Sequence, residues 1–167
     1  MVMKTNIGLL IAAMLLLACH KDKSIVVDLN LTECPANSSC VYNYYDRADF
    51  STISPIGSGS NRVFLYSRSN GVCGPSSQFY IKISPNYNDF NISLSQLASG
   101  QMIAYNNICP CCARAALLTQ VIGGEIKGKR INATRWLINA RIILGTSSTA
   151  PTDSIKVNQY FTLSKLP

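Results

Sequence analysis

The feature that most limits the possible folds is a two-residue alternation of side chains in the second half of the chain. Between residues 133 and 144 every second position forms one mostly apolar set: Thr134, Trp136, Ile138, Ala140, Ile142 and Leu144. The opposite set mixes apolar and polar residues: Arg135, Leu137, Asn139, Arg141 and Ile143. Alternation of this kind predicts a β-strand. Because both faces carry apolar residues, we expect a central strand with Trp136 in the core.

Shorter segments with similar patterns or strand-forming residues predict that the whole second part of the chain is β structure. We expect further strands at residues 24–31, 40–45, 62–67, 78–84, 90–97, 101–105, 125–131 and 155–163. The segment 125–131 should pair with 133–144 as a hairpin, after an interruption at Gly123-Gly124. Residues 46–61 and 145–153 are rich in loop formers, and 113–120 fits a helix or a strand. The sequence therefore predicts an all-β fold, an antiparallel sandwich or barrel of about eight strands.

The first 18 residues have the pattern of a targeting segment rather than of a fold. Lys4 is the only charged residue there, and an apolar run follows from Ile7 to Ala18. Twelve helical residues rise about 18 Å, less than the roughly 30 Å hydrocarbon core of a bilayer. We therefore expect residues 1–18 to be a signal peptide that is removed on export.

The end of that run carries a more specific motif. Leu16-Leu17-Ala18-Cys19 resembles the lipobox of bacterial lipoproteins processed by signal peptidase II. The resemblance implies that Cys19 becomes the first residue and carries acyl chains such as palmitate. Each buried CH2 contributes about 0.8 kcal/mol, so several chains hold a protein stably on a membrane. It also implies a place in the cell envelope, on the outer membrane, facing the periplasm or the surface.

The residues after the lipobox divide into a tether and a domain. Residues 19–24 comprise the acylated cysteine and a short charged stretch, His20-Lys21-Asp22-Lys23-Ser24. That stretch is similar to the surface-export tethers of some diderm bacteria, and it also fits a simple solvated spacer. We expect residues 25–167 to form a single β domain, since one domain is usual for this length.

If Cys19 is the anchor, an even number of cysteines is left in the domain. These are Cys34, Cys40, Cys73, Cys109, Cys111 and Cys112. In an exported domain such a set predicts disulfide bonds, although six cysteines allow 15 pairings. Cys34 and Cys40 enclose a short turn-forming segment and are expected to pair, and Cys73 is expected to join the Cys109–Cys112 cluster.

The same cluster is compatible with two other chemistries. Thiolates of Cys109, Cys111 and Cys112 suit soft metal ions, although the paired spacing typical of zinc sites is absent from the sequence. Cys109 and Cys112 also have the spacing of a redox-active thiol pair. A thiol-dependent redox or metal-binding protein is therefore an alternative function.

Positive charge is concentrated in the late part of the chain. Residues 19–167 carry a net charge of +6. The candidate basic patch comprises Lys127, Lys129, Arg130, Arg135 and Arg141 on the expected hairpin. Such a patch would attract an anionic glycan or an envelope protein, with nucleic acid a less suitable partner. The alternative is a solvated sheet face, where lysine discourages edge pairing.

The sequence offers little material for catalysis. It has one histidine, His20 on the tether, so the usual nucleophile–histidine arrangements cannot be assembled in the domain. We expect no catalytic residue, resident metal ion or cofactor, and no enzyme activity. The favoured function is that of a lipid-anchored envelope or surface protein with a binding or structural role, its ligand unknown. An anionic-glycan-binding module that uses residues 125–141 is a second alternative.

Overall fold

A computed structural model of the chain describes residues 29–51, 56–71, 76–98, 103–108, 120–147 and 150–167. The prediction of a mostly β chain is confirmed. In chain order the elements are β1 (Ser39–Asp49), β2 (Gly57–Ser69), β3 (Ser76–Ile83), β4 (Asp89–Ile92), α2 (Leu94–Ala98), β5 (Ile103–Ile108), β6 (Gln120–Asn132), β7 (Arg135–Ser147) and β8 (Ala150–Leu163). Eight of the nine predicted strand segments thus contain a strand, most of them longer than expected.

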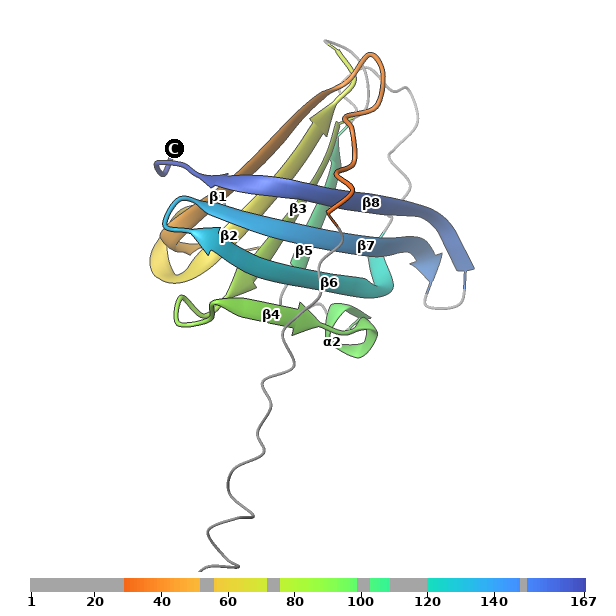
Figure 1. The fold of residues 1–167 in the computed structure, drawn as a ribbon. Helices are drawn as coiled ribbons and strands as arrows, with labels where there is room; N and C mark the ends of the chain where they lie inside the picture. Colours follow the sequence, from red (N-terminus) through yellow and green to blue (C-terminus); the bar gives the residue numbers. More distant parts are fainter. Residues whose placement is uncertain (1–28, 52–55, 72–75, 99–102, 109–119, 148–149) are drawn as a thin grey trace, which may run out of the picture.

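The described strands join in one sheet, in the order β4-β6-β7-β8-β1-β2-β3-β5. Figure 1 shows that this sheet curls over itself, so that β6, β7 and β8 cross in front of β1, β2 and β3. The shape is an incomplete barrel formed by one curled sheet, rather than the two stacked sheets of a sandwich.

The two halves of the sheet meet where the first and last strands pair. Within each half neighbouring strands are antiparallel, as the sequence predicts, but β1 and β8 are parallel, with Asn43 beside Thr162 and Tyr44 beside Leu163. The prediction of a purely antiparallel sheet is therefore wrong at this junction. β1, β2 and β3 form one meander with β5 at its outer edge, and β6, β7 and β8 form another with β4 at its outer edge; the two join through β1 and β8, which run in the same direction.

The main core lies inside the curl, between the two halves. The ring of Phe64 on β2 lies 5.3 Å from that of Trp136 on β7 and 5.6 Å from that of Phe90 on β4. Trp136 and Phe64 are fully buried, which confirms the predicted core position of the tryptophan. These aromatic contacts connect strands that are not neighbours in the sheet and hold the curl closed.

A smaller apolar cluster covers the outside of the β1–β2 hairpin. Tyr45, Ala48, Ile56 and Val63 form it, and Leu166 from the C-terminal segment packs against it. The amide of Ser164 donates to the carbonyl of Tyr44 at 2.9 Å, so the chain end is held along β1. The C-terminal segment therefore forms part of the surface at that end of the barrel.

The strand predicted at residues 24–31 does not form in its described part. Residues 29–31 are not in a strand, and Leu29 is 76% exposed. The segment lies against β8, where Thr32 donates its amide to the carbonyl of Asn158. The amide of Asn158 donates in turn to the Thr32 hydroxyl instead of a backbone carbonyl, so the ladder does not continue.

The prediction of a strand over 90–97 is correct only for its first residues. β4 ends at Ile92, and α2 begins two residues later. The Gln96 side-chain oxygen accepts a hydrogen bond from the amide of Ser93 at 2.9 Å, and Leu97 donates to the Ser93 carbonyl. Half of a capping box therefore starts a short helix and outweighs the strand-like composition.

Two other sequence predictions need correction. β6 passes through Gly123-Gly124 without a break, just after a register shift between Val121 and Gly123, because Gly124 takes a φ of 129° and leaves room for the Arg141 carbonyl. The predicted loop over 46–61 is shorter, because β1 continues to Asp49 and β2 already starts at Gly57. The uncertain segment 113–120 lies outside the described residues except for Gln120.

Candidate functional site

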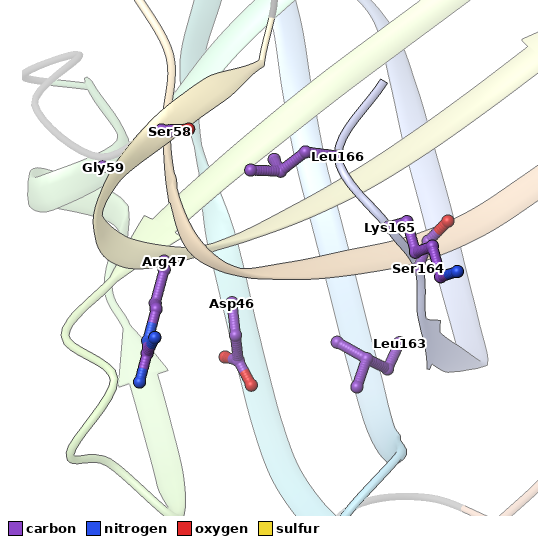
Figure 2. A pocket seen from close by; sticks show the side chains of 8 residues that line it. All are labelled: Asp46, Arg47, Ser58, Gly59, Leu163, Ser164, Lys165 and Leu166. Carbon is purple, nitrogen blue, oxygen red and sulfur yellow. The ribbon is translucent and has the colours of Figure 1, made fainter.

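An open groove of about 780 Å³ lies at the end of the barrel where β1 leads into β2. Figure 2 shows that its walls come from the end of β1, the start of β2 and the C-terminal segment. The lining residues are Asp46, Arg47, Ser58, Gly59, Leu163, Ser164, Lys165 and Leu166. The groove is largely apolar, with charged groups at its margin.

The backbone of β1 is irregular where it lines the groove. Arg47 has a φ of 54°, a left-handed conformation that is uncommon for residues other than glycine. It falls at a β-bulge, where the pairing between β1 and β2 shifts register between Asp46 and Ala48. Such conformations cost about 1–3 kcal/mol and cluster at functional sites. The bulge therefore gives Arg47 a direction that a regular strand would not.

Close contact between the two strands is permitted by a glycine. A Cβ atom added at Gly59 would lie 2.5 Å from the Asp49 Cβ and 2.8 Å from the Ala48 carbonyl group. Any larger residue would force β1 and β2 apart at this point. Gly59, which lines the groove, therefore allows β1 and β2 to approach closely there.

The charges at the groove margin are not balanced. Asp46 is bound by the buried guanidinium of Arg62, an ion pair that neutralises the carboxylate. Arg47 and Lys165 form no ion pair with any residue in the part of the chain that the structure describes. An apolar groove with two such cations at its edge favours a ligand that combines an apolar portion with an anionic group.

The predicted basic patch divides between the two faces of the β6–β7 hairpin, which forms as the sequence predicts. Lys127, Lys129, Arg135 and Arg141 alternate with the core positions and lie on the outer face. Arg130 is in register with Trp136, on the opposite face, and donates to the carbonyl of Asn132. The structure thus brings four of the five residues to one face.

The four cations on the outer face lie far apart, and two of them already interact with neighbouring side chains. Lys127 pairs with Glu125 at 3.1 Å. The Arg135 guanidinium carbon lies 4.3 Å from the centre of the Tyr160 ring. Arg135 and Arg141 are six residues apart on one strand, roughly 20 Å. The face is therefore an extended basic stripe suited to a long polymer rather than a pocket for a small anion.

The cysteine predictions are tested only at the start of the domain. Cys34 and Cys40 form a disulfide with their Cα atoms 5.8 Å apart, as the sequence predicts. The turn they enclose has Asn37 at a φ of 59°, and the amide of Ser38 donates to the Pro35 carbonyl. Cys19, Cys73, Cys109, Cys111 and Cys112 lie outside the described residues.

Two kinds of feature are absent from the described residues. These residues contain no group of three or more His, Cys, Asp or Glu residues that converges as a metal site. Nor does any helix among them have the length and apolar character needed to cross a membrane.

Sequence reasoning missed the groove residues Arg47, Leu163, Lys165 and Leu166. No local pattern marks them, because the groove forms only when the C-terminal segment packs beside the β1–β2 hairpin. Arg47 carries no such signal either, because it falls within residues 46–61, where the sequence predicts a loop.

No protein-family model, curated protein or solved structure is significantly similar to this chain.

Proposed function

We propose that this chain is a lipid-anchored protein of the cell envelope whose β domain binds an anionic amphiphile, a molecule with an apolar chain and a negative head group. The observation that carries the binding role is the apolar groove bordered by Arg47 and Lys165. The anchor rests on the lipobox-like sequence that ends at Cys19.

The compartment is supported by the Cys34–Cys40 disulfide. Disulfides persist in oxidising compartments such as the periplasm and the cell surface, and they are rare in the cytosol. A disulfide in the described part of the domain therefore agrees with export. By extension, we propose that Cys73 and the Cys109–Cys112 cluster form further disulfides that staple the barrel.

Metabolic labelling with a palmitate analogue tests the anchor. The wild-type protein should take up label and fractionate with the membrane, and Cys19→Ala should do neither. Cys34→Ala is the matched control, because it also removes one cysteine but leaves the lipobox intact. Equal labelling of Cys19→Ala and the wild type would refute the anchor.

Titration with a fluorescent fatty acid tests the groove. Leu163 is 40% exposed and lies in the groove, so Leu163→Asp should weaken binding by placing a negative charge beside the ligand. Val41 is 42% exposed and does not line the groove, so Val41→Asp is a matched control that should bind normally. Equal loss in both variants, or no binding by the wild type, would refute the proposed ligand.

A second candidate function, binding of an anionic glycan, is favoured by the four cations on the outer face of β6 and β7. Dextran sulfate would serve as the probe. Binding of dextran sulfate should weaken as the salt concentration increases. It should also weaken in the double variant Arg135→Ala/Arg141→Ala. Arg130→Ala, on the other face, is the control and should bind normally. Binding that is insensitive to salt and to the double variant would exclude this candidate.

The thiol-dependent alternative stays a prediction, since Cys109, Cys111 and Cys112 lie outside the described residues. Counting thiols in the unreduced protein separates it from structural disulfides. Free thiols or bound metal would favour the hypothesis of a redox or metal-binding protein over that of structural disulfides.

A further inference from the structure

A second, more enclosed cavity of about 120 Å³ lies at the opposite end of β1 and β2 from the groove. Its inner wall includes Tyr42, Tyr66, Arg68 and Ser77, from the faces of β1, β2 and β3 that point into the barrel. Ser77 is 6% exposed, and the rings of Tyr42 and Tyr66 are 5.5 Å apart. The cavity is therefore a polar region at the edge of an otherwise apolar core.

Arg68 is the unusual member of this wall. It alternates with Phe64 and Tyr66, so its side chain belongs to the inner face of β2. Its Nε atom is buried and has no hydrogen-bond partner among the described residues. No carboxylate among the described residues forms an ion pair with Arg68. A buried donor on a charged group is costly when it is left without a partner.

A second arginine on the same strand, Arg62, has partners for its guanidinium group. Arg62 also faces inward and is 5% exposed. Its guanidinium binds Asp46, donates to the Tyr87 carbonyl at 3.4 Å, and lies 5.0 Å from the centre of the Trp136 ring. Among the described residues Arg62 has partners and the Nε of Arg68 has none, which leaves the Arg68 Nε available to a ligand.

We propose that this cavity binds a small carboxylate, a monoanion whose two oxygens accept hydrogen bonds from the Arg68 guanidinium. The planar fork of arginine matches a carboxylate in this way. Tyr42 offers a further donor, since burial, and next the neighbouring Tyr66, raises the pKa of its phenol and keeps it protonated.

The charges and the size of the cavity favour a monoanion over phosphate. The two carboxylates of the lining, Glu33 and Asp153, equal in number its two cations, Arg68 and Lys156, so the formal charge of the lining is zero before a ligand enters. A dianion would be repelled more strongly by the two carboxylates than a monoanion would. The volume corresponds to roughly four water molecules at about 30 Å³ each, enough for a short carboxylate such as propionate.

Thermal unfolding of the purified full-length protein tests the site, with sodium propionate as the probe. The Tm should rise with propionate and reach a plateau, because a ligand that binds only the folded state stabilises it. Sodium chloride at equal ionic strength should give no such rise, and sodium phosphate should give a smaller one. Arg68→Met should weaken the propionate response about 10- to 100-fold, the loss expected for hydrogen bonds to a charged group.

Arg141→Met is the matched control, because it removes an exposed arginine from the outer face and should leave the propionate response unchanged. The Nε–H resonance of Arg68 in the wild-type protein gives a direct readout that does not depend on a variant folding. It should shift on addition of propionate.

Three results would overturn the proposal: an unshifted Arg68 resonance, a chloride effect equal to that of propionate, or a full propionate response in Arg68→Met. A stronger response to phosphate than to propionate would refute the preference for a monoanion. Because the cavity and the groove are at opposite ends of β1 and β2, Leu163→Asp should keep the propionate response. Loss of fatty-acid binding in the groove would therefore leave the proposal for the cavity intact, and the reverse also holds.

Discussion

The guanidinium carbon of Arg62 on β2 lies 5.0 Å from the centre of the Trp136 ring on β7, and the same guanidinium binds Asp46 on β1. The contact joins strands from the two halves of the curled sheet and covers one end of the main core. The Tyr44 ring centre lies 5.8 Å from the same guanidinium carbon. The charged side chain of Arg62 thus covers the apolar core at that end of the barrel.

Replacing Arg62 by alanine should lower the free energy of unfolding by about 2–4 kcal/mol. The change removes a desolvated cation–π contact, worth about 2 kcal/mol, and leaves Asp46 without its partner. Denaturant unfolding measures the effect. Arg135→Ala is the control, since it removes a cation–π contact with Tyr160 on the outer face and should cost only about 0.5–1 kcal/mol. Similar losses in both variants would contradict this role of Arg62.

Arg47→Gly should stabilise the protein by about 1 kcal/mol and at the same time weaken binding of the fatty acid. Glycine adopts a φ of 54° without the steric cost that arginine bears. Arg47→Ala keeps that cost, so it should weaken binding without the gain in stability. Unfolding curves and ligand titration of the two variants separate backbone strain from side-chain charge. A destabilised Arg47→Gly with normal binding would show that the bulge has no part in the site.

Gly59→Ala should destabilise the protein by about 1–3 kcal/mol, the usual cost of forcing a group into a filled space. The added Cβ would collide with Asp49 and the Ala48 backbone. Gly57→Ala is a matched control two residues earlier, because a Cβ there meets nothing within 4 Å. Thermal unfolding should show a lower Tm for Gly59→Ala alone. Equal behaviour of the two variants would contradict the close approach of the strands.

Replacing both Cys34 and Cys40 by serine should lower the free energy of unfolding by about 2 kcal/mol, the entropic effect of a loop of this size. At about 2–4 °C per kcal/mol, the Tm should fall by about 4–8 °C. The wild-type protein under reducing conditions should show a fall at least as large. A Tm that is unchanged in the double variant would mean that the disulfide adds nothing to stability.

Asp49 should contribute to stability in a pH-dependent way. A hydrogen bond from Lys82 at 2.8 Å is the largest cause that lowers the pKa of this carboxyl group, with Phe50 and Asn61 also donating to it. Because the pKa is lower in the folded state, the contribution is present above the unfolded value of about 3.9 and is lost as pH falls through the folded value.

The stability difference between the wild type and Asp49→Asn should therefore be constant near neutral pH and shrink below about pH 4. Urea unfolding at a series of pH values measures it. In a Lys82→Met background most of this dependence should disappear. A difference that grows as the pH falls would contradict the assignment.

The amino-acid pattern alone predicts much of the secondary structure. The alternation around Trp136 extends over β7, and the pairing of that strand with the segment before it follows from their closeness in the chain. Cys34 and Cys40 could be paired because the residues between them favour a turn. Local signals suffice for these features because the interacting residues are near one another in sequence.

The curl of the sheet, the groove and the enclosed cavity could not be predicted, since they depend on contacts between distant parts of the chain. The parallel pairing of β1 with β8 leaves no mark in either strand. Arg68 lies one residue beyond the predicted strand 62–67, but it continues the every-second-residue series of Phe64 and Tyr66, and this was a usable signal. An arginine at an inward position is a candidate for a ligand contact or a buried ion pair, and only the structure distinguishes Arg68 from Arg62.

Intact-mass spectrometry of protein extracted from the membrane, after free thiols are blocked, measures whether the chain is anchored through an acylated Cys19. We expect a chain that begins at Cys19, carries acyl groups and shows no blocked thiols. A chain that still begins at Met1, or one that begins at residue 19 without acyl groups, would contradict the lipid anchor.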